Sequence, residues 1–290
     1  MRVLVTGAGG LLGGRIAAGL SDRGFDILAA YRHGVPPPGL SSVALELTNP
    51  GAVEALLDRE TPAAVIHSAA LARGDQCQAQ PDLAEEVNVR LPGRLAALCR
   101  PRGIRLVGVS TDLVLDGERA LSDESQAAPL SIYGRSKLAG EEALLSADPS
   151  AAVVRVALVV GRGHGPRGTA SESIARALSA GRRVRLFTDE FRSPLDPASI
   201  TAALALLLER GGTGRFHLGG PERLSRHELG LRTARALDLS TDGIAAGRQA
   251  DHVGPEPRPA DTSLDSTRAH RELGWWPRPL DEALAESRTD

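Results

Sequence analysis

Short apolar runs alternate with amphipathic segments over the first 160 residues. The runs are rich in Val, Leu, Ile and Ala and predict strands, whereas the segments between them repeat apolar residues at helical spacing. Apolar strands separated by helices are typical of a parallel sheet covered on both faces. The pattern therefore predicts a doubly wound α/β fold, with strands at 2–6, 26–31, 43–47, 63–67, 105–109 and 152–160.

The pattern becomes looser after Gly161. Apolar periodicity predicts helices at 172–180, 197–209 and 225–237, and short strands at 184–187 and 215–218. A Pro-rich segment at 254–259 and a Trp-Trp-Pro turn at 275–277 indicate a smaller, irregular C-terminal lobe. We therefore predict two units, residues 1–160 and residues 161–290, with some segments of the second returning to the first.

Composition excludes several classes of protein. The 34 Lys+Arg nearly balance 36 Asp+Glu, which argues against a nucleic-acid partner held by phosphate contacts. Cys77 and Cys99 lack a CxxC spacing and the histidines lack metal-ligand spacing, so we expect neither a disulfide framework nor a metal. The apolar runs are too short to span a membrane, and glycines replace the apolar region of a signal peptide. We expect a cytoplasmic protein.

A glycine-rich turn follows the first predicted strand. Gly7, Gly10 and Gly13 separate that strand from the first predicted helix. Without side chains there, the backbone turns tightly and approaches a diphosphate at the helix N-terminus. This arrangement predicts dinucleotide binding by a Rossmann-type doubly wound parallel sheet, with a smaller C-terminal substrate lobe.

The end of the second predicted strand bears on the choice of dinucleotide. An NAD-specific site would place a carboxylate there to accept the ribose 2′-OH. This strand ends Ala30-Tyr31-Arg32-His33, without a carboxylate, and Arg32 can face a 2′-phosphate instead. We therefore expect NADP(H); the alternative for Arg32 is a solvated loop cation.

Lys137 is the chain's single lysine, and it follows Tyr133 by four residues. On a helix this spacing places both side chains on one face. Moving a phenol pKa from near 10 into the neutral range takes roughly 4 kcal/mol, and a cation about 4 Å away supplies about that much. The pair therefore predicts acid/base chemistry without a metal, against the alternative of a solvated helix face.

Hydroxyl side chains follow the fifth predicted strand, at the sheet edge where open α/β sheets bind ligands. Thr111 there could hydrogen-bond a substrate carbonyl oxygen beside Tyr133, with Ser110 as the second choice. The alternative is a local turn made by these hydroxyls.

Three segments together resemble the extended short-chain dehydrogenase/reductase superfamily, and within it the dTDP-4-dehydrorhamnose reductase family. They are 6–13, with the glycine turn, 110–117, which opens Ser-Thr-Asp, and 133–141, with the Tyr/Lys pair. Weaker support comes from Asn88 and from segments 191–194 and 258–265. The resemblance implies hydride transfer from NADPH to C4 of a 4-keto-6-deoxy sugar nucleotide.

By the same resemblance, Tyr133 protonates the forming alkoxide, Lys137 lowers the Tyr133 pKa and holds the nicotinamide ribose, and Thr111 binds the carbonyl oxygen. The implied cofactor contacts are Gly7, Gly10, Leu11, Leu12, Gly13, Arg32, Ala69, Ala70, Tyr133 and Lys137. The implied substrate contacts are Ser110, Asp112 and Arg192.

The leading hypothesis is therefore an NADPH-dependent reductase of a nucleotide sugar, without a nucleic-acid or membrane partner; a homodimer is compatible with the sequence. A 4,6-dehydratase would carry Glu where Leu113 stands. A 4-epimerase stays open as an alternative. A non-catalytic NADP-binding subunit, resembling the regulatory subunit of methionine adenosyltransferase, is the alternative from another class.

Overall fold

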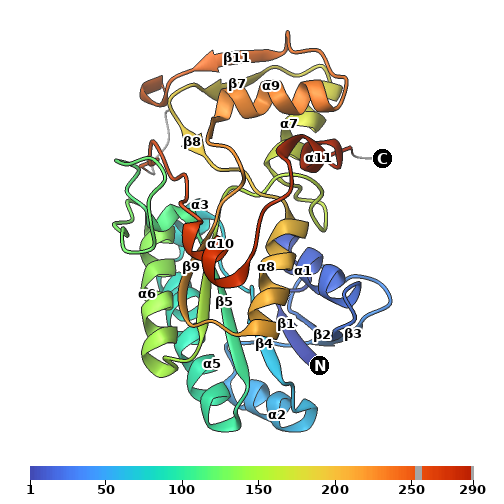
Figure 1. Ribbon diagram of the computed structural model, residues 1–290, viewed down its shortest axis with the longest axis vertical. Helices are drawn as coiled ribbons and strands as arrows, with labels where there is room; N and C mark the ends of the chain where they lie inside the picture. The colour runs from blue at the N-terminus through green and yellow to red at the C-terminus, as the bar shows by residue number, and fades with distance from the viewer. Residues whose placement is uncertain (252–256, 289–290) are drawn as a thin grey trace.

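A computed structural model describes residues 1–251 and 257–288, and its main element is a seven-stranded parallel sheet (Figure 1). The strand order is β3-β2-β1-β4-β5-β6-β9. Strands β2 and β3 are added on one side of β1, and the later strands are added on its other side, as in a Rossmann-type fold. The predicted fold class is therefore confirmed. The strands are β1 (Arg2–Thr6), β2 (Asp26–Tyr31), β3 (Ser41–Ala44), β4 (Ala64–His67), β5 (Arg105–Thr111), β6 (Ala152–Val156) and β9 (Gly214–Leu218).

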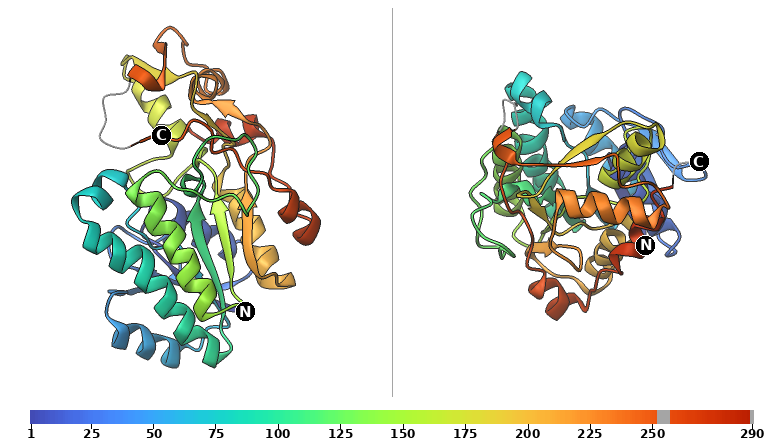
Figure 2. Two further views of the ribbon diagram at one scale, coloured as in Figure 1. Left: turned by 90° about the vertical axis from the view of Figure 1, so that its left-hand side faces the viewer. Right: turned by 90° about the horizontal axis from the view of Figure 1, so that it is seen from above.

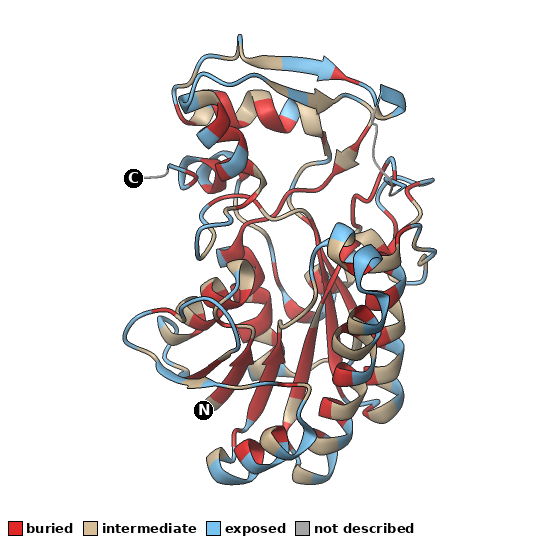
Figure 3. Cartoon of the chain, turned by 180° about the vertical axis from the view of Figure 1, so that it is seen from behind, coloured by how far each residue is buried: buried red, intermediate tan, exposed pale blue. Residues whose placement is uncertain are grey.

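Alternate residues of the inner strands face opposite layers of helices, which explains why these strands carry apolar residues on both faces. Val3 and Val5 belong to the core that includes α1 (Leu11–Ser21) and α8 (Pro197–Arg210). Leu4, between them, belongs to the core with α2 (Pro50–Glu60), α5 (Leu91–Cys99) and α6 (Ile132–Ala147). Figure 3 shows the strands buried between these layers.

A smaller lobe stands over the carboxyl ends of the sheet strands, as the views in Figures 1 and 2 show. Val160, Leu229, Leu280 and Leu284 form its core. Its elements are α7 (Ala170–Ser179), α9 (Arg226–Ala236), α11 (Leu280–Ala285), the parallel pair β7 (Val184–Phe187) and β11 (Ile244–Gly247), and the antiparallel pair β8 (Phe191–Arg192) and β10 (Leu224–Ser225).

Three elements from the C-terminal part of the sequence lie with the large sheet. Strand β9 pairs with β6, α8 packs beside α1, and α10 (Thr267–Leu273) packs against α8 and β9. Strand β6 ends at Val156 rather than at Val160, because β9 ends opposite it at Leu218. Beyond that point Val159 bridges to Leu195, and Val160 enters the core of the small lobe.

Local signals set the ends of several helices. The Asn49 side chain accepts from the Ala52 N–H at the start of α2, and Ser131 caps α6 in the same way. In the described ranges, the helices are too short or too polar to cross a bilayer. The remaining elements are α3 (Gly74–Ala79), α4 (Pro81–Ala84), η1 (Glu85–Arg90), η2 (Arg100–Arg102), η3 (Asp112–Val114) and η4 (Gln249–Asp251).

Candidate active site

The glycine turn between β1 and α1 is closely packed backbone. Gly7 has a φ of +72°, and a Cβ there would lie 2.8 Å from the Ala69 nitrogen. A Cβ at Gly13 would lie 2.3 Å from the Gly7 carbonyl oxygen. No side chain caps the N-terminus of α1, whose N-cap residue is Gly10. Unpaired N–H groups of a helix start attract an anion, so this turn has the shape and donors that a diphosphate requires.

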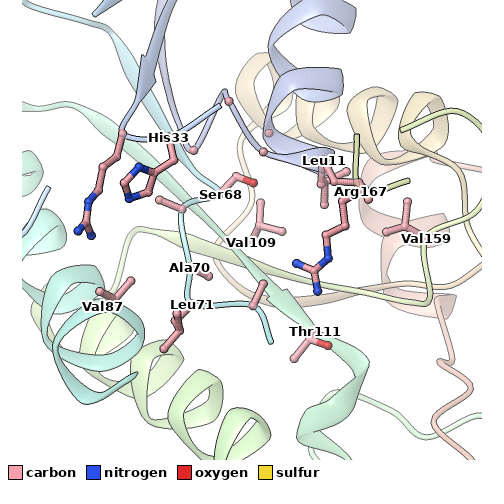
Figure 4. A pocket seen from close by; sticks show the side chains of 18 of the residues that line it. Leu11, His33, Ser68, Ala70, Leu71, Val87, Val109, Thr111, Val159 and Arg167 are labelled. Atoms are coloured by element: carbon pink, nitrogen blue, oxygen red, sulfur yellow. The ribbon is translucent and has the colours of Figure 1, made fainter. Parts of the chain in front are cut away.

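The turn opens on a cavity of about 910 Å³ along the carboxyl edge of the sheet. The cavity extends from His33, past the glycine turn, to Thr111 at the end of β5 (Figure 4). Its volume is near the upper end of the range of small-molecule pockets. Ten predicted cofactor contacts line it, namely Gly7, Gly10, Leu11, Leu12, Gly13, Arg32, Ala69, Ala70, Tyr133 and Lys137.

Arg32 lies at the β2 end of this cavity and is paired with a carboxylate. Its Nε is 2.7 Å from Glu46 Oε2, and both side chains are about half exposed. Burial acts to raise the Glu46 pKa, but hydrogen bonds from the Thr48 hydroxyl and N–H, with the charge of Arg32, outweigh it and lower that pKa below its usual value. A 2′-phosphate at this end would therefore share Arg32 with Glu46.

A buried, neutral histidine, His67, ends β4 just before the lining residues Ser68 and Ala69. Thr6 Oγ1 accepts from the N–H groups of Ser68 and Ala69, which leaves its hydroxyl free to donate to His67 Nδ1 at 2.8 Å. Burial, with the nearby charge of Lys137, lowers the His67 pKa to about 3. His67 is thus a buried structural residue that supports the turn before Ala69.

Helix α6 carries the Tyr/Lys pair to the cavity. Lys137 is buried, and its Nζ donates to the Val109 carbonyl oxygen at 2.9 Å. Burial lowers the Lys137 pKa to about 8, against the opposing effect of the Glu141 carboxylate. The ammonium therefore lies in the cavity wall at the end of β5.

The Tyr133 pKa differs from the fall predicted from the sequence. Burial raises it above its usual value, and the Asp112 carboxylate adds to the rise. A hydrogen bond with Thr111 and the charge of Arg167 act in the opposite direction. The helical spacing is as predicted, but burial of the phenol outweighs the charge of Arg167, and the Lys137 ammonium is directed to a backbone carbonyl.

Ser110 and Thr111 occupy successive positions of β5, and their hydroxyls have different partners. Thr111 Oγ1 donates to Asp112 Oδ1 at 3.1 Å and accepts from the Leu113 N–H, so it also forms the local turn considered as an alternative. Ser110 Oγ donates to the buried Glu141 at 2.5 Å. Although both residues line the cavity, the Ser110 hydroxyl proton is committed to a carboxylate behind it.

Asp112 and Arg192, predicted as substrate contacts, meet between the two lobes. Asp112 Oδ2 accepts from the Thr262 hydroxyl at 2.7 Å and lies 3.8 Å from Arg192 Nε. The Arg192 side chain is 5% exposed and also pairs with Glu190 at 3.1 Å. Asp112 lines the cavity, whereas Arg192 lies behind it and fixes that carboxylate.

Sequence reasoning missed two charged groups at this site. Glu141 is buried beneath Ser110 and pairs with Arg155 at 2.8 Å and with Arg215 at 2.9 Å. Arg167 lies in the loop after β6 and points into the cavity beside Thr111 (Figure 4). The glycines around Arg167, after a strand that ends at the ligand-binding edge, were the signal that could have identified it.

Comparison with known proteins gives relatives that align with nearly all of the chain or with just over half of it. A probable low-salt glycan biosynthesis reductase, Agl14 of Haloferax volcanii, is 32% identical, with 98% of this chain and 96% of the relative aligned. A dTDP-4-dehydrorhamnose reductase of Mycobacterium tuberculosis is 38% identical over 57% of this chain, which spans 52% of that relative. Methionine adenosyltransferase 2 subunit beta of Xenopus laevis is 35% identical over 55% of this chain and 47% of its own.

Solved structures are similar over nearly the entire chain. A hypothetical dTDP-4-dehydrorhamnose reductase of Sulfolobus tokodaii has a TM-score of 0.84 at 28% identity, covering 97% of this chain and 98% of its own. MoeE5 in complex with UDP-glucuronic acid and NAD has a TM-score of 0.83 at 27% identity, covering 99% of this chain and 97% of its own.

These likenesses bear out the family and the oxidoreductase class expected from the sequence. The description of the matching family is "RmlD substrate binding domain", and the match covers residues 1–290. The chain therefore belongs to the RmlD substrate binding domain family, within the extended short-chain dehydrogenase/reductases.

Proposed function

We propose that this protein reduces the 4-keto group of a nucleotide-activated 6-deoxy sugar, with NADPH as the hydride donor. One observation carries the proposal: Thr111, Tyr133 and Lys137 line the same cavity as a glycine turn without a side-chain cap. The names of the reductase relatives and the sugar nucleotide bound to MoeE5 support the substrate class. Hydride and proton are then delivered from one cavity.

The residues present fit a dinucleotide. The α1 N-terminus and the turn at Gly7 would hold its diphosphate, and Lys137 would hold the hydroxyls of the nicotinamide ribose. Arg32 would contact a 2′-phosphate, which favours NADP(H) over NAD(H). When bound, the nicotinamide supplies a hydride to the carbonyl carbon.

Tyr133 supplies the matching proton. Its raised pKa keeps the phenol protonated across the neutral range, which is the state that a reduction needs. The proton passes from Tyr133 Oη to the carbonyl oxygen as the C–H bond forms, which converts the ketone into an alcohol. Thr111 is placed to position that oxygen once its hydroxyl leaves Asp112, and the Lys137 ammonium stabilises the phenolate left behind.

The test is NADPH oxidation, followed by absorbance, across a panel of dTDP- and GDP-linked 4-keto-6-deoxy sugars. The proposal expects stoichiometric oxidation with at least one of them and formation of a 4-hydroxy sugar nucleotide. Interconversion of 4-hydroxy epimers without net NADPH consumption would instead identify an epimerase. Absence of both reactions across the panel would contradict the proposed reaction.

The match to methionine adenosyltransferase 2 subunit beta supports one other candidate, a binding subunit without turnover. Such a subunit would bind NADP and a partner protein, and it would not need a reactive pair. Thr111, Tyr133 and Lys137 are all present on this cavity, which favours the enzyme. Cofactor binding without any turnover over the panel would favour the subunit.

A further inference from the structure

Residues 161–169 form a strap beside the cavity, and hydrogen bonds fix both of its ends. Thr169 Oγ1 donates to the Gly161 carbonyl at 2.6 Å, and the Gly161 N–H donates to Ser171 Oγ at 2.9 Å. In the middle of the strap, the His164 N–H donates to the Leu11 carbonyl at 3.0 Å, on the first residue of α1. The strap is therefore held against the glycine turn before any ligand binds.

Arg167 is the cation that this strap presents to the cavity. Its side chain is directed into the cavity near Thr111 (Figure 4). Of the other cations on the lining, Arg32 pairs with Glu46 and Lys137 donates to a backbone carbonyl. Among residues 1–251 and 257–288, Arg167 has neither an ion pair nor a side-chain hydrogen bond. Its guanidinium donors are therefore free for a ligand.

Three backbone N–H groups at the start of α7, next to the strap, are not available to bind an anion. The Ala170 N–H donates to the Val159 carbonyl at 3.1 Å. Thr169 and Glu172 form a capping box in which each backbone N–H donates to the other side chain. Because the N–H groups of Thr169, Ala170 and Glu172 are occupied, these donors are not available to an anion, whereas the Arg167 guanidinium is.

The position of Arg167 favours an anion on the substrate over one on the cofactor. The glycine turn and the N-terminus of α1 already provide donors for the cofactor diphosphate. The guanidinium lies instead toward Thr111, at the reacting end of the cavity, where its charge acts on Tyr133. A nucleotide-activated sugar carries two phosphates next to the ring that reacts, within reach of a flexible arginine.

We propose that Arg167 binds the diphosphate of the sugar nucleotide and so anchors the substrate beside Tyr133; this inference rests on the proposed function. A guanidinium matches phosphate oxygens in a two-pronged geometry, and the strap holds the backbone that carries it in place in advance. The contact uses a group that every nucleoside-diphosphate sugar carries. It therefore selects for the diphosphate class and not for one sugar or base.

The test measures binding to the NADP⁺-saturated protein by calorimetry, with dTDP, UDP and UDP-glucuronic acid as probes. Arg167→Ala should weaken all three by roughly 10- to 100-fold, the scale of a charge-assisted contact. Arg167→Lys should restore part of that loss. Arg162→Ala, an exposed arginine of the strap outside the cavity lining, is the matched control and should bind all three as the unaltered protein does. Affinity of each variant for NADPH should stay within about twofold.

Three outcomes would overturn the inference. Loss of NADPH affinity with unchanged dTDP binding would make Arg167 a cofactor contact. Loss confined to UDP-glucuronic acid would assign Arg167 to a sugar carboxylate. Failure of the unaltered protein to bind dTDP or UDP would remove the subsite. Because binding needs no turnover, Arg167-dependent dTDP binding without any ketone reduction would refute the proposed reaction and leave this contact standing.

Discussion

Lys137 is expected to lower the stability of the unliganded protein at neutral pH. Its side chain is buried and its pKa falls from 10.5 to about 8, since burial disfavours the ammonium. A fall of about 2.5 units corresponds to about 3 kcal/mol of lost interaction for the charged form. Lys137→Met removes this charge from the folded state. It also removes the hydrogen bond to Val109 O, a loss that does not depend on pH.

The pH dependence separates the two effects. Between about pH 8 and pH 10.5, Lys137 is neutral in the native protein and still protonated in the unfolded chain. The unfolded state then binds more protons, so stability rises with pH in the unaltered protein. From pH 7 to pH 9 the titration of Lys137 raises the free energy of unfolding by about 1 kcal/mol. The Lys137→Met variant lacks it.

The measurement is urea unfolding of both proteins at pH 7 and pH 9, without cofactor. The free energy of unfolding of the unaltered protein, relative to Lys137→Met, should increase by about 1 kcal/mol between the two pH values. Arg135→Met, which removes an exposed cation from the same helix, is the control and should show no such increase. A difference between the unaltered protein and Lys137→Met that is constant with pH would refute the reasoning. Turnover should be lost in Lys137→Met, because the proposed function needs the ammonium to hold the nicotinamide ribose and to stabilise the phenolate of Tyr133.

Three further changes test other parts of the site. Tyr133→Phe should lower kcat by roughly 10²-fold or more; undiminished turnover would exclude Tyr133 as the proton donor. Arg32→Ala should weaken NADPH much more than NADH in a fluorescence titration, and equal losses would count against a 2′-phosphate contact. Glu141→Gln should destabilise the fold by about 3–5 kcal/mol in urea at pH 7, because it leaves Arg155 without its buried partner. The Glu141 pKa is lowered, so this stabilisation is present above the carboxyl's usual pKa and fades as pH falls below it; a loss that persists unchanged in acid would contradict this account.

Local sequence carries much of the fold and part of the site. Apolar runs such as 2–6 and 105–109 identify sheet strands because a strand covered on both faces has no polar side. The spacing of Gly7 and Gly13 identifies the turn, since no other residue fits the backbone contacts there. The four-residue spacing of Tyr133 and Lys137 needs only helical geometry to place both on one face of α6.

Tertiary structure decides what those residues experience and which others join them. Strand β9 joins the large sheet although almost 60 residues separate it from β6, its partner, and such a pairing depends on the packing of both lobes. Burial raises the Tyr133 pKa, and the position of the Val109 carbonyl determines where the ammonium points; neither is encoded in a four-residue spacing. Arg167 faces the cavity from a loop whose ends are joined by the hydrogen bond that the Thr169 hydroxyl donates to the Gly161 carbonyl. Sequence by itself thus identifies chemistry that is local along the chain, whereas solvent exclusion and contacts between distant segments set charge, pKa and direction.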